Sequence, residues 1–256
     1  MIQYKILETG FFWADGGAMF GPIPKRAWNR KAKSDEDNRV RMGMNCLLAW
    51  DEQHVVLLDT GVGTKSLGQL SYYDFHNLQD IRQLVRNEGF EVEDITHVVL
   101  SHLHFDHCGA CTYIDENGKE AITFPKAQHY VSQLQWDTFL SPSDLEKDSF
   151  RKEDLFALKA HNLLHYIEKP TELFPGFKID ICDGHTHGQL VSSFISGSDT
   201  IVFPGDLIPT KNHVSDLWLS AYDIEPLKSL ESKRRIKDEF KDKSSVWVYY
   251  HDSLSL

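Results

Sequence analysis

Residues 101–107 hold four side chains of the kinds that bind metal ions: His102, His104, Asp106 and His107. Neutral imidazole nitrogens and carboxylate oxygens suit zinc and other first-row transition metals. His102, His104 and Asp106 share one parity, so an extended chain would point all three in the same direction. His107 breaks that parity, which predicts a turn there, with Asp106 near the start of a helix. The segment should therefore present ligands to one cavity from two directions.

Three more ligand-type residues stand directly after strand-like runs further along the chain: His185, Asp206 and His251. Side chains on loops carried by rigid strands are a common way to build a site. A single four-coordinate catalytic ion would not take four ligands from one loop and still keep a water and distant ligands. We therefore predict two ions in one cavity; such pairs lie about 3.5–4 Å apart and clamp the reacting oxygens.

Short strand-like runs alternate with helical patterns along the chain. The strand-like runs cover residues 4–8, 46–50, 54–58, 97–101, 129–132, 177–182, 191–195, 200–203 and 246–250. Apolar residues at helical spacing predict helices over residues 78–87, 134–140, 152–164 and 227–240. Residues 16–38 are rich in Gly, Pro and charge and are expected to form a long surface loop. Together these patterns indicate a layered α/β domain with mixed sheets.

Composition narrows the class of protein. The chain has 256 residues, 41% of them apolar and 25% charged, which fits one globular domain over residues 1–256. Its net charge of −11 argues against a nucleic-acid partner, because such proteins gain affinity by neutralising phosphates. The N-terminus has no basic leader, and no run approaches the roughly 20 apolar residues that span a bilayer. We therefore expect no membrane partner and a cytoplasmic location.

The motifs together resemble those of the metallo-β-lactamase superfamily. The resemblance rests on motifs in the family's order: Asp-Thr-Gly at 59–61, H-x-H-x-D-H at 102–107, Gly-His-Thr at 184–186, Gly-Asp at 205–206, and His-Asp at 251–252. It implies an α/β fold, a four-layer αββα sandwich with two mixed β-sheets and the site at their edge.

The resemblance also implies how the ligands are divided. One metal would be held by His102, His104 and His185, and the other by Asp106, His107 and His251. Asp206 would bridge both ions and pass a proton to the leaving oxygen, while Asp106 would also orient the nucleophile. Asp59 would support the site without binding metal, and His187 would stand behind the ligands or in the wall.

Within the superfamily, residues 15–25, 35–39 and 221–226 are similar to the branch of N-acyl-homoserine lactonases and methyl-parathion-hydrolase-like enzymes. This similarity implies a metal-dependent hydrolase whose bridging hydroxide opens a lactone or ester in a small-molecule substrate, N-acyl-homoserine lactones among them. The cofactors would be two divalent ions, zinc by default, with iron, manganese or cobalt as alternatives. Some lactonases carry a tyrosine three residues after the bridging aspartate, where this chain has Pro209.

Several alternatives stay open at the level of sequence. The same metals could serve a phosphotriester or phosphodiester hydrolase, a single iron could make a sulfur dioxygenase, and a homodimer is compatible with the chain. Tyr222 and His213 are candidate donors toward a substrate. An apolar stretch near the N-terminus could line an acyl pocket, the core or a dimer contact: Phe11, Phe12, Trp13, Met19 and Phe20.

Overall fold

Two β-sheets form the centre of the structure, a computed structural model that describes residues 1–253. The first sheet has the strand order β1 (Gln3–Asp15), β2 (Arg39–Trp50), β3 (Val55–Leu58), β4 (His97–Val99), β7 (Gln128–Ser132), β8 (Leu164–Ile167). Its first three strands are antiparallel, and the strands from β3 to β8 are parallel. The sheet is therefore mixed.

The second sheet has the strand order β13 (Ser245–Trp247), β12 (Asp199–Phe203), β11 (Gln189–Ser196), β10 (Phe177–Cys182), β9 (Thr171–Phe174). All its pairs are antiparallel except β12 with β13. A separate two-stranded sheet, β5 (Thr112–Ile114) with β6 (Glu120–Ile122), was not predicted.

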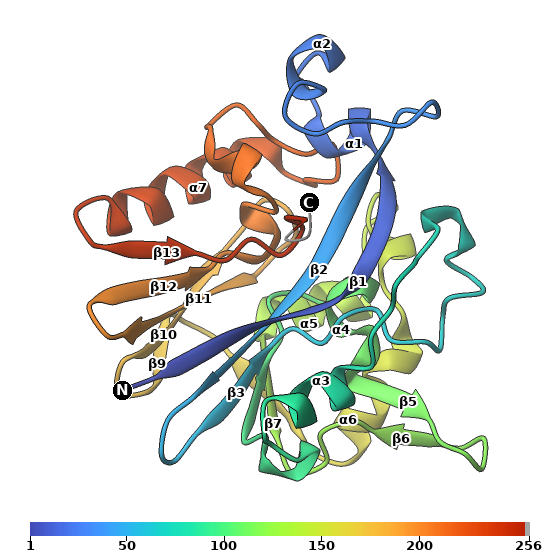
Figure 1. The fold of residues 1–256 in the computed structure, drawn as a ribbon, viewed down its shortest axis with the longest axis vertical. Helices are drawn as coiled ribbons and strands as arrows, with labels where there is room; N and C mark the ends of the chain where they lie inside the picture. Colours follow the sequence, from blue (N-terminus) through green and yellow to red (C-terminus); the bar gives the residue numbers. More distant parts are fainter. Residues whose placement is uncertain (254–256) are drawn as a thin grey trace.

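Helices lie outside the two large sheets (Figure 1). Beside the first sheet are α3 (Ile81–Asn87), α4 (Phe105–Cys108), α5 (Gln133–Leu140) and α6 (Phe156–Ala160), and α7 (Pro226–Phe240) covers the second sheet. Short helices α1 (Gly16–Phe20) and α2 (Lys25–Trp28) connect β1 to β2. The 3₁₀ turns are η1 (Ser71–Tyr73), η2 (Val92–Asp94), η3 (Gly109–Cys111), η4 (Lys147–Ser149), η5 (Lys152–Asp154), η6 (Gly205–Leu207) and η7 (Lys211–Val214). This arrangement confirms the predicted four-layer αββα sandwich with two mixed β-sheets.

Apolar side chains from both large sheets form one continuous core. All four residues of β3 are buried, as expected for a strand that is covered on both faces. Phe177 of β10 stacks on Phe194 of β11, with 5.5 Å between ring centroids, and Tyr4 of β1 meets Phe194 edge-on at 6.0 Å. The contact between Tyr4 and Phe194 joins the two sheets, so the loops at their common edge are held in fixed relative positions.

Two local predictions were wrong. Residues 16–38 are not simply a surface loop, because Phe20 and Trp28 are buried and their rings stack at 5.2 Å. The helix predicted over residues 152–164 breaks into η5 and α6, and Leu164 already belongs to β8. Asn162 takes a left-handed φ of 56°, which ends the helix and starts the strand.

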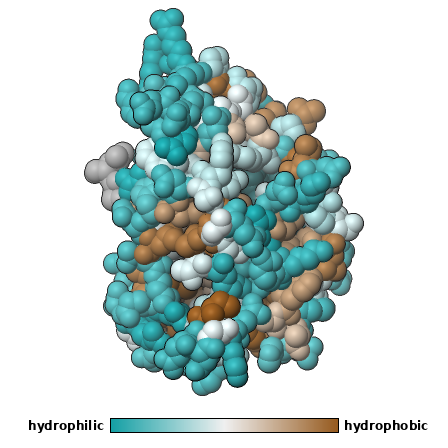
Figure 2. All heavy atoms as spheres, turned by 90° about the vertical axis from the view of Figure 1, so that its right-hand side faces the viewer, coloured by the Kyte–Doolittle hydropathy of each residue, from teal (hydrophilic) through white to brown (hydrophobic). Residues whose placement is uncertain are grey.

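The surface is mainly hydrophilic on the face drawn in Figure 2, where hydrophobic side chains gather only in small, separate patches. Single exposed apolar side chains are normal on globular proteins. None of the helices between residues 1 and 253 combines the length and apolar character required to cross a bilayer.

His129 of β7 is a buried imidazole away from the predicted ligands. Its Nδ1 bonds the Ala127 carbonyl at 3.1 Å, and its Nε2 has no partner among residues 1–253. Burial lowers the pKa of His129 to about 4. Protonation therefore costs the folded state more than the unfolded chain.

We predict that His129 makes the fold sensitive to acid. Because its pKa is lowered on folding, its contribution is present above about pH 6.5 and is lost as the pH falls toward 4. From about pH 7 to about pH 5, the wild type should lose about 2 kcal/mol more unfolding free energy than His129→Leu, measured by urea titration. His161→Leu, at an exposed histidine, should behave like the wild type. Equal losses in the wild type and His129→Leu would contradict this.

Candidate metal centre

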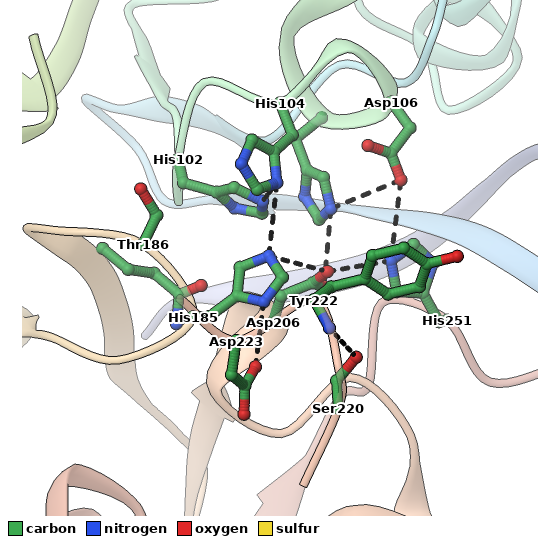
Figure 3. A network of polar contacts seen from close by, with 12 residues as sticks. His102, His104, Asp106, His185, Thr186, Asp206, Ser220, Tyr222, Asp223 and His251 are labelled. Carbon is green, nitrogen blue, oxygen red and sulfur yellow. Dashed lines mark hydrogen bonds and ion pairs between the residues drawn. The ribbon is translucent and has the colours of Figure 1, made fainter. Parts of the chain in front are cut away.

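The seven predicted ligands come from five segments and meet at one edge of the two sheets (Figure 3). His102 and His104 follow β4, and α4 carries Asp106 and His107. The other three stand after β10, in η6 after β12, and after β13: His185, Asp206 and His251. All seven are buried, with at most 9% of any of them exposed.

The turn predicted within residues 102–107 is present. His104 has extended backbone (φ −68°, ψ 149°) and caps α4, which begins at Phe105. The chain thus changes from extended to helical between His104 and Asp106. This change brings His107 round to the same cavity as the residues before it.

Two glycines allow the loops that carry His185 and Asp206 to pack closely against neighbouring segments. Gly184, before His185, has a φ of +136°, and a Cβ there would lie 2.2 Å from the backbone nitrogen of Ser229. Gly205, before Asp206, has a φ of +52°, and its Cβ would lie 2.9 Å from Cβ of Ser101. Residues with a side chain rarely adopt such backbone angles and would clash here, so glycine is needed at both positions.

The first group of ligand atoms comes from three histidines. His104 Nδ1 lies 3.0 Å from His102 Nε2 and 3.2 Å from His185 Nε2. Three imidazole nitrogens that face one another place lone pairs in one small volume, where a cation would relieve their repulsion. The group could therefore hold a metal ion.

The second group combines one carboxylate with two histidines. Asp106 Oδ2 lies 3.6 Å from His107 Nε2 and 3.6 Å from His251 Nε2. Asp206 stands between the groups: its Oδ1 is 3.4 Å from His107 Nε2, and its Oδ2 is 3.2 Å from His251 Nε2 and 3.5 Å from His185 Nε2. A ligand that bridges two ions needs this position.

Each histidine is held on its other side by a second group. The partners are Ser101 Oγ for His102 (3.1 Å), Glu146 Oε1 for His104 (3.1 Å), Asp59 Oδ2 for His107 (2.8 Å), Asp223 Oδ1 for His185 (3.1 Å) and the Gly43 carbonyl for His251 (2.8 Å). If each imidazole donates its N–H to this partner, its other nitrogen presents a lone pair to the cluster.

Glu146 and Asp223 were not identified from the sequence. Each lies far along the chain from the histidine that it contacts. Glu146 belongs to none of the motifs, and the similarity of residues 221–226 to the lactonase branch assigned no role to Asp223. His187 does not line the pocket; it pairs with Glu225 at 3.3 Å.

The charges of the centre favour metal binding. Burial lowers the pKa of His102 well below its usual value, so this imidazole stays neutral, as a ligand must. Burial would also lower the pKa of His107, but the charges of Asp106, Asp206 and Asp59 raise it well above its usual value. His107 Nε2 and Asp206 Oδ1 lie 3.4 Å apart, and both are buried without a hydrogen-bond partner among residues 1–253. Buried polar atoms normally have partners, so these residues fit a bound cation.

A pocket opens over these groups. Its apolar wall includes Phe12, Met19, Phe105 and, at the rim, Leu145. Of the N-terminal aromatics, Phe12 lines the pocket, whereas Phe11 and Trp13 stack on His76 and Phe20 lies in the core. The acyl-pocket hypothesis therefore applies to Phe12 and Met19 only.

The two candidate donors differ in their surroundings. His213 is buried outside the pocket, with Nε2 2.8 Å from the Met19 carbonyl and Nδ1 2.7 Å from Thr210 Oγ1. Tyr222 lines the pocket, and burial, with the neighbouring Tyr73, raises the pKa of its phenol. Only Tyr222 can reach a bound molecule.

The metallo-β-lactamase superfamily model matches residues 41–251, most of the chain. The chain belongs to this superfamily. It is also 30% identical to a probable metal-dependent hydrolase from Staphylococcus aureus, whose crystal structure superimposes with a TM-score of 0.89 over 98% of this chain and 89% of that one.

Two lactonases are similar to this chain at lower identity. N-acyl homoserine lactonase AiiA of Bacillus thuringiensis subsp. kurstaki is 24% identical over 220 residues, 81% of this chain and 80% of that protein. AidC, a dizinc quorum-quenching lactonase solved with its product, has a TM-score of 0.72 at 21% identity, over 98% of this chain and 87% of AidC. The prediction of a metal-dependent hydrolase in the metallo-β-lactamase superfamily is confirmed.

Glu146 should strengthen metal binding through His104. Its carboxylate is buried and fixes the ring, and the loss of such a partner usually costs 10- to 100-fold in metal affinity. We expect that loss in Glu146→Ala, measured by competition with a chromogenic chelator, with unchanged circular dichroism. Glu116→Ala, at an exposed turn, is the matched control. Equal zinc affinity in the two variants would show that Glu146 does not support the site.

Proposed function

We propose that this superfamily member uses two divalent ions, with zinc as the default, to open lactones or carboxylic esters that carry an apolar acyl chain. N-acyl-homoserine lactones are the first candidates, since lactonases of that type are among its relatives. The proposed ligands are His102, His104 and His185 for one ion, Asp106, His107 and His251 for the other, and Asp206 for both.

The charge of the pocket is the observation that carries this proposal. Within residues 1–253, the lining includes four carboxylates, those of Asp106, Glu146, Asp206 and Asp223, and neither lysine nor arginine. Asp59 adds a fifth carboxylate behind His107. Two divalent ions would bring fewer positive charges than these five carboxylates bring negative ones. An anionic substrate would therefore gain little attraction, whereas a neutral lactone or ester avoids the repulsion.

This charge balance separates the alternatives. A phosphodiester is an anion and finds neither lysine nor arginine among the described residues that line the pocket. A phosphotriester is neutral and stays the second candidate. A sulfur dioxygenase with one iron would leave unexplained the second group, formed by Asp106, His107 and His251.

Different residues of the chain would have different roles in the hydrolysis. When bound, the ions would act as Lewis acids and make a water nucleophilic near neutral pH. Asp106 lines the pocket and would orient that water. Asp206 would stay ionised as a ligand shared by both groups, because three imidazoles surround its carboxylate and stabilise its negative charge. Phe12, Met19 and Leu145 would bury the acyl chain.

The proposal predicts proton release from N-acyl-homoserine lactones by the zinc-loaded protein, measured with a pH indicator. Each added CH₂ that is buried contributes about 0.8 kcal/mol, so kcat/KM should rise up to about fourfold per carbon while the pocket has room. Asp206→Ala should abolish turnover without unfolding. Hydrolysis of a dialkyl nitrophenyl phosphate without lactone opening would favour the phosphotriesterase alternative, and preference for the matching monoanionic diester would refute the charge argument.

Metal content provides a separate test of the ligand assignment. Equilibrium dialysis against zinc should give two ions per chain for the wild type. Asp206→Ala should bind zinc more weakly at both positions, because its carboxylate contacts histidines of both groups. A single ion in the wild type, or two tightly bound ions in Asp206→Ala, would contradict the bridging role.

A further inference from the structure

Cleavage of a lactone or alkyl ester needs a proton at the leaving oxygen, because an alkoxide is a poor leaving group. The pocket offers few groups that can give one. The two ring nitrogens of each ligand histidine are already engaged, one facing the other ligands and one bonded to an outer partner. Both oxygens of Asp206 face imidazole nitrogens at 3.2–3.5 Å, so this carboxylate is poorly placed to turn toward a substrate.

Among residues 1–253, the remaining O–H groups in the pocket lining belong to Tyr73, Ser149 and Tyr222. A serine hydroxyl is a much weaker acid than a phenol, which leaves the two tyrosines. The Tyr73 ring is part of the apolar wall: it packs against Phe105 at 5.1 Å and Phe12 at 6.0 Å. Tyr73 therefore has a packing role that explains its presence.

Tyr222 has no such packing role. Neither an aromatic contact nor a hydrogen bond of its phenol is found among residues 1–253, and the residue is 39% exposed. In Figure 3 its ring extends across the pocket that Asp206 and His251 also line. The phenol therefore faces the space where a substrate would lie.

The backbone at Tyr222 is nevertheless held firmly. Its N–H donates to Ser220 Oγ at 3.0 Å, and Ala221 N–H donates to the Ala18 carbonyl at 2.8 Å. On the other side, Asp223 bonds His185, and Ile224 N–H donates to the His185 carbonyl at 3.3 Å. Tyr222 thus stands at a fixed distance from a proposed ligand, as a group that acts on a reacting atom must.

We propose that Tyr222 is the general acid that protonates the leaving oxygen, an assignment that rests on the proposed function. The oxygen of water forms a bond to the acyl carbon, and the bond from that carbon to the leaving oxygen breaks. The electron pair of that bond stays on the leaving oxygen, which takes the proton of Tyr222 Oη. Of the two protons that the attacking water carries, one returns to the Tyr222 phenolate and the other is released as the acid ionises, so the sum is water plus lactone giving a hydroxy carboxylate and a proton.

The test compares two neutral substrates with the same acyl group, an alkyl ester or lactone and a nitrophenyl ester. Nitrophenolate leaves without a proton, so it needs no general acid. General acids typically contribute 10²–10⁴-fold. In zinc-loaded Tyr222→Phe, kcat should fall at least about 100-fold for the lactone and less than about threefold for the nitrophenyl ester. Tyr73→Phe, which removes the other phenol of the pocket, should not show this selective loss.

Two further measurements show whether Tyr222→Phe acts by disturbing the structure of the site rather than by removing a proton donor. Zinc content and calorimetric binding of an unreactive γ-lactam analogue should be the same in the wild type and Tyr222→Phe. Equal slowing of both substrates, no slowing of either, or loss of zinc from Tyr222→Phe would overturn the role of Tyr222 and leave the proposed function standing. A wild type that opens neither lactone nor ester would overturn both.

Discussion

The structure depends on burying seven metal-binding side chains within a few ångströms of one another. Bringing imidazoles and carboxylates together away from water is costly unless every charge and every N–H finds a partner. Outer groups such as Glu146 and Asp223 meet part of this requirement by fixing individual histidines. The shared core of the two sheets meets the rest, because it holds the ends of β4, β10, β12 and β13 at one edge. The fold therefore offsets the cost of gathering these side chains.

The sequence could predict interactions between residues that are near one another in the chain, but not interactions between distant ones. The 102–107 motif was predictable because its ligands are neighbours, and the parity of an extended chain is a local rule. Glu146 and Asp223 could not be found, because their contacts depend on how distant loops fold back over the sheet edge. The break at Asn162 was missed for a related reason: helical spacing does not reveal a single left-handed residue.

The segment between β1 and β2 shows why a composition rule failed and what the segment does instead. Gly, Pro and charge indicated a surface loop, yet the Phe20 ring stacks between Trp28 and His213, each about 5.2 Å away. His213 in turn bonds the Met19 carbonyl, and the Ala18 carbonyl accepts from Ala221. These contacts connect the N-terminal segment to the loop that carries Tyr222 and Asp223. Its apolar residues therefore support the site from behind rather than forming a loop of their own.

The acidic character of the pocket has a consequence for the end of the proposed reaction. Opening a neutral lactone would create a carboxylate in the pocket that Glu146 and Asp223 line, where the described residues offer neither lysine nor arginine. Like charges in a partly desolvated pocket repel more strongly than in bulk water. The carboxylates that discourage anionic substrates would thus also weaken the binding of an anionic product. The outer carboxylates would then serve twice, by orienting the histidine ligands and by favouring product release.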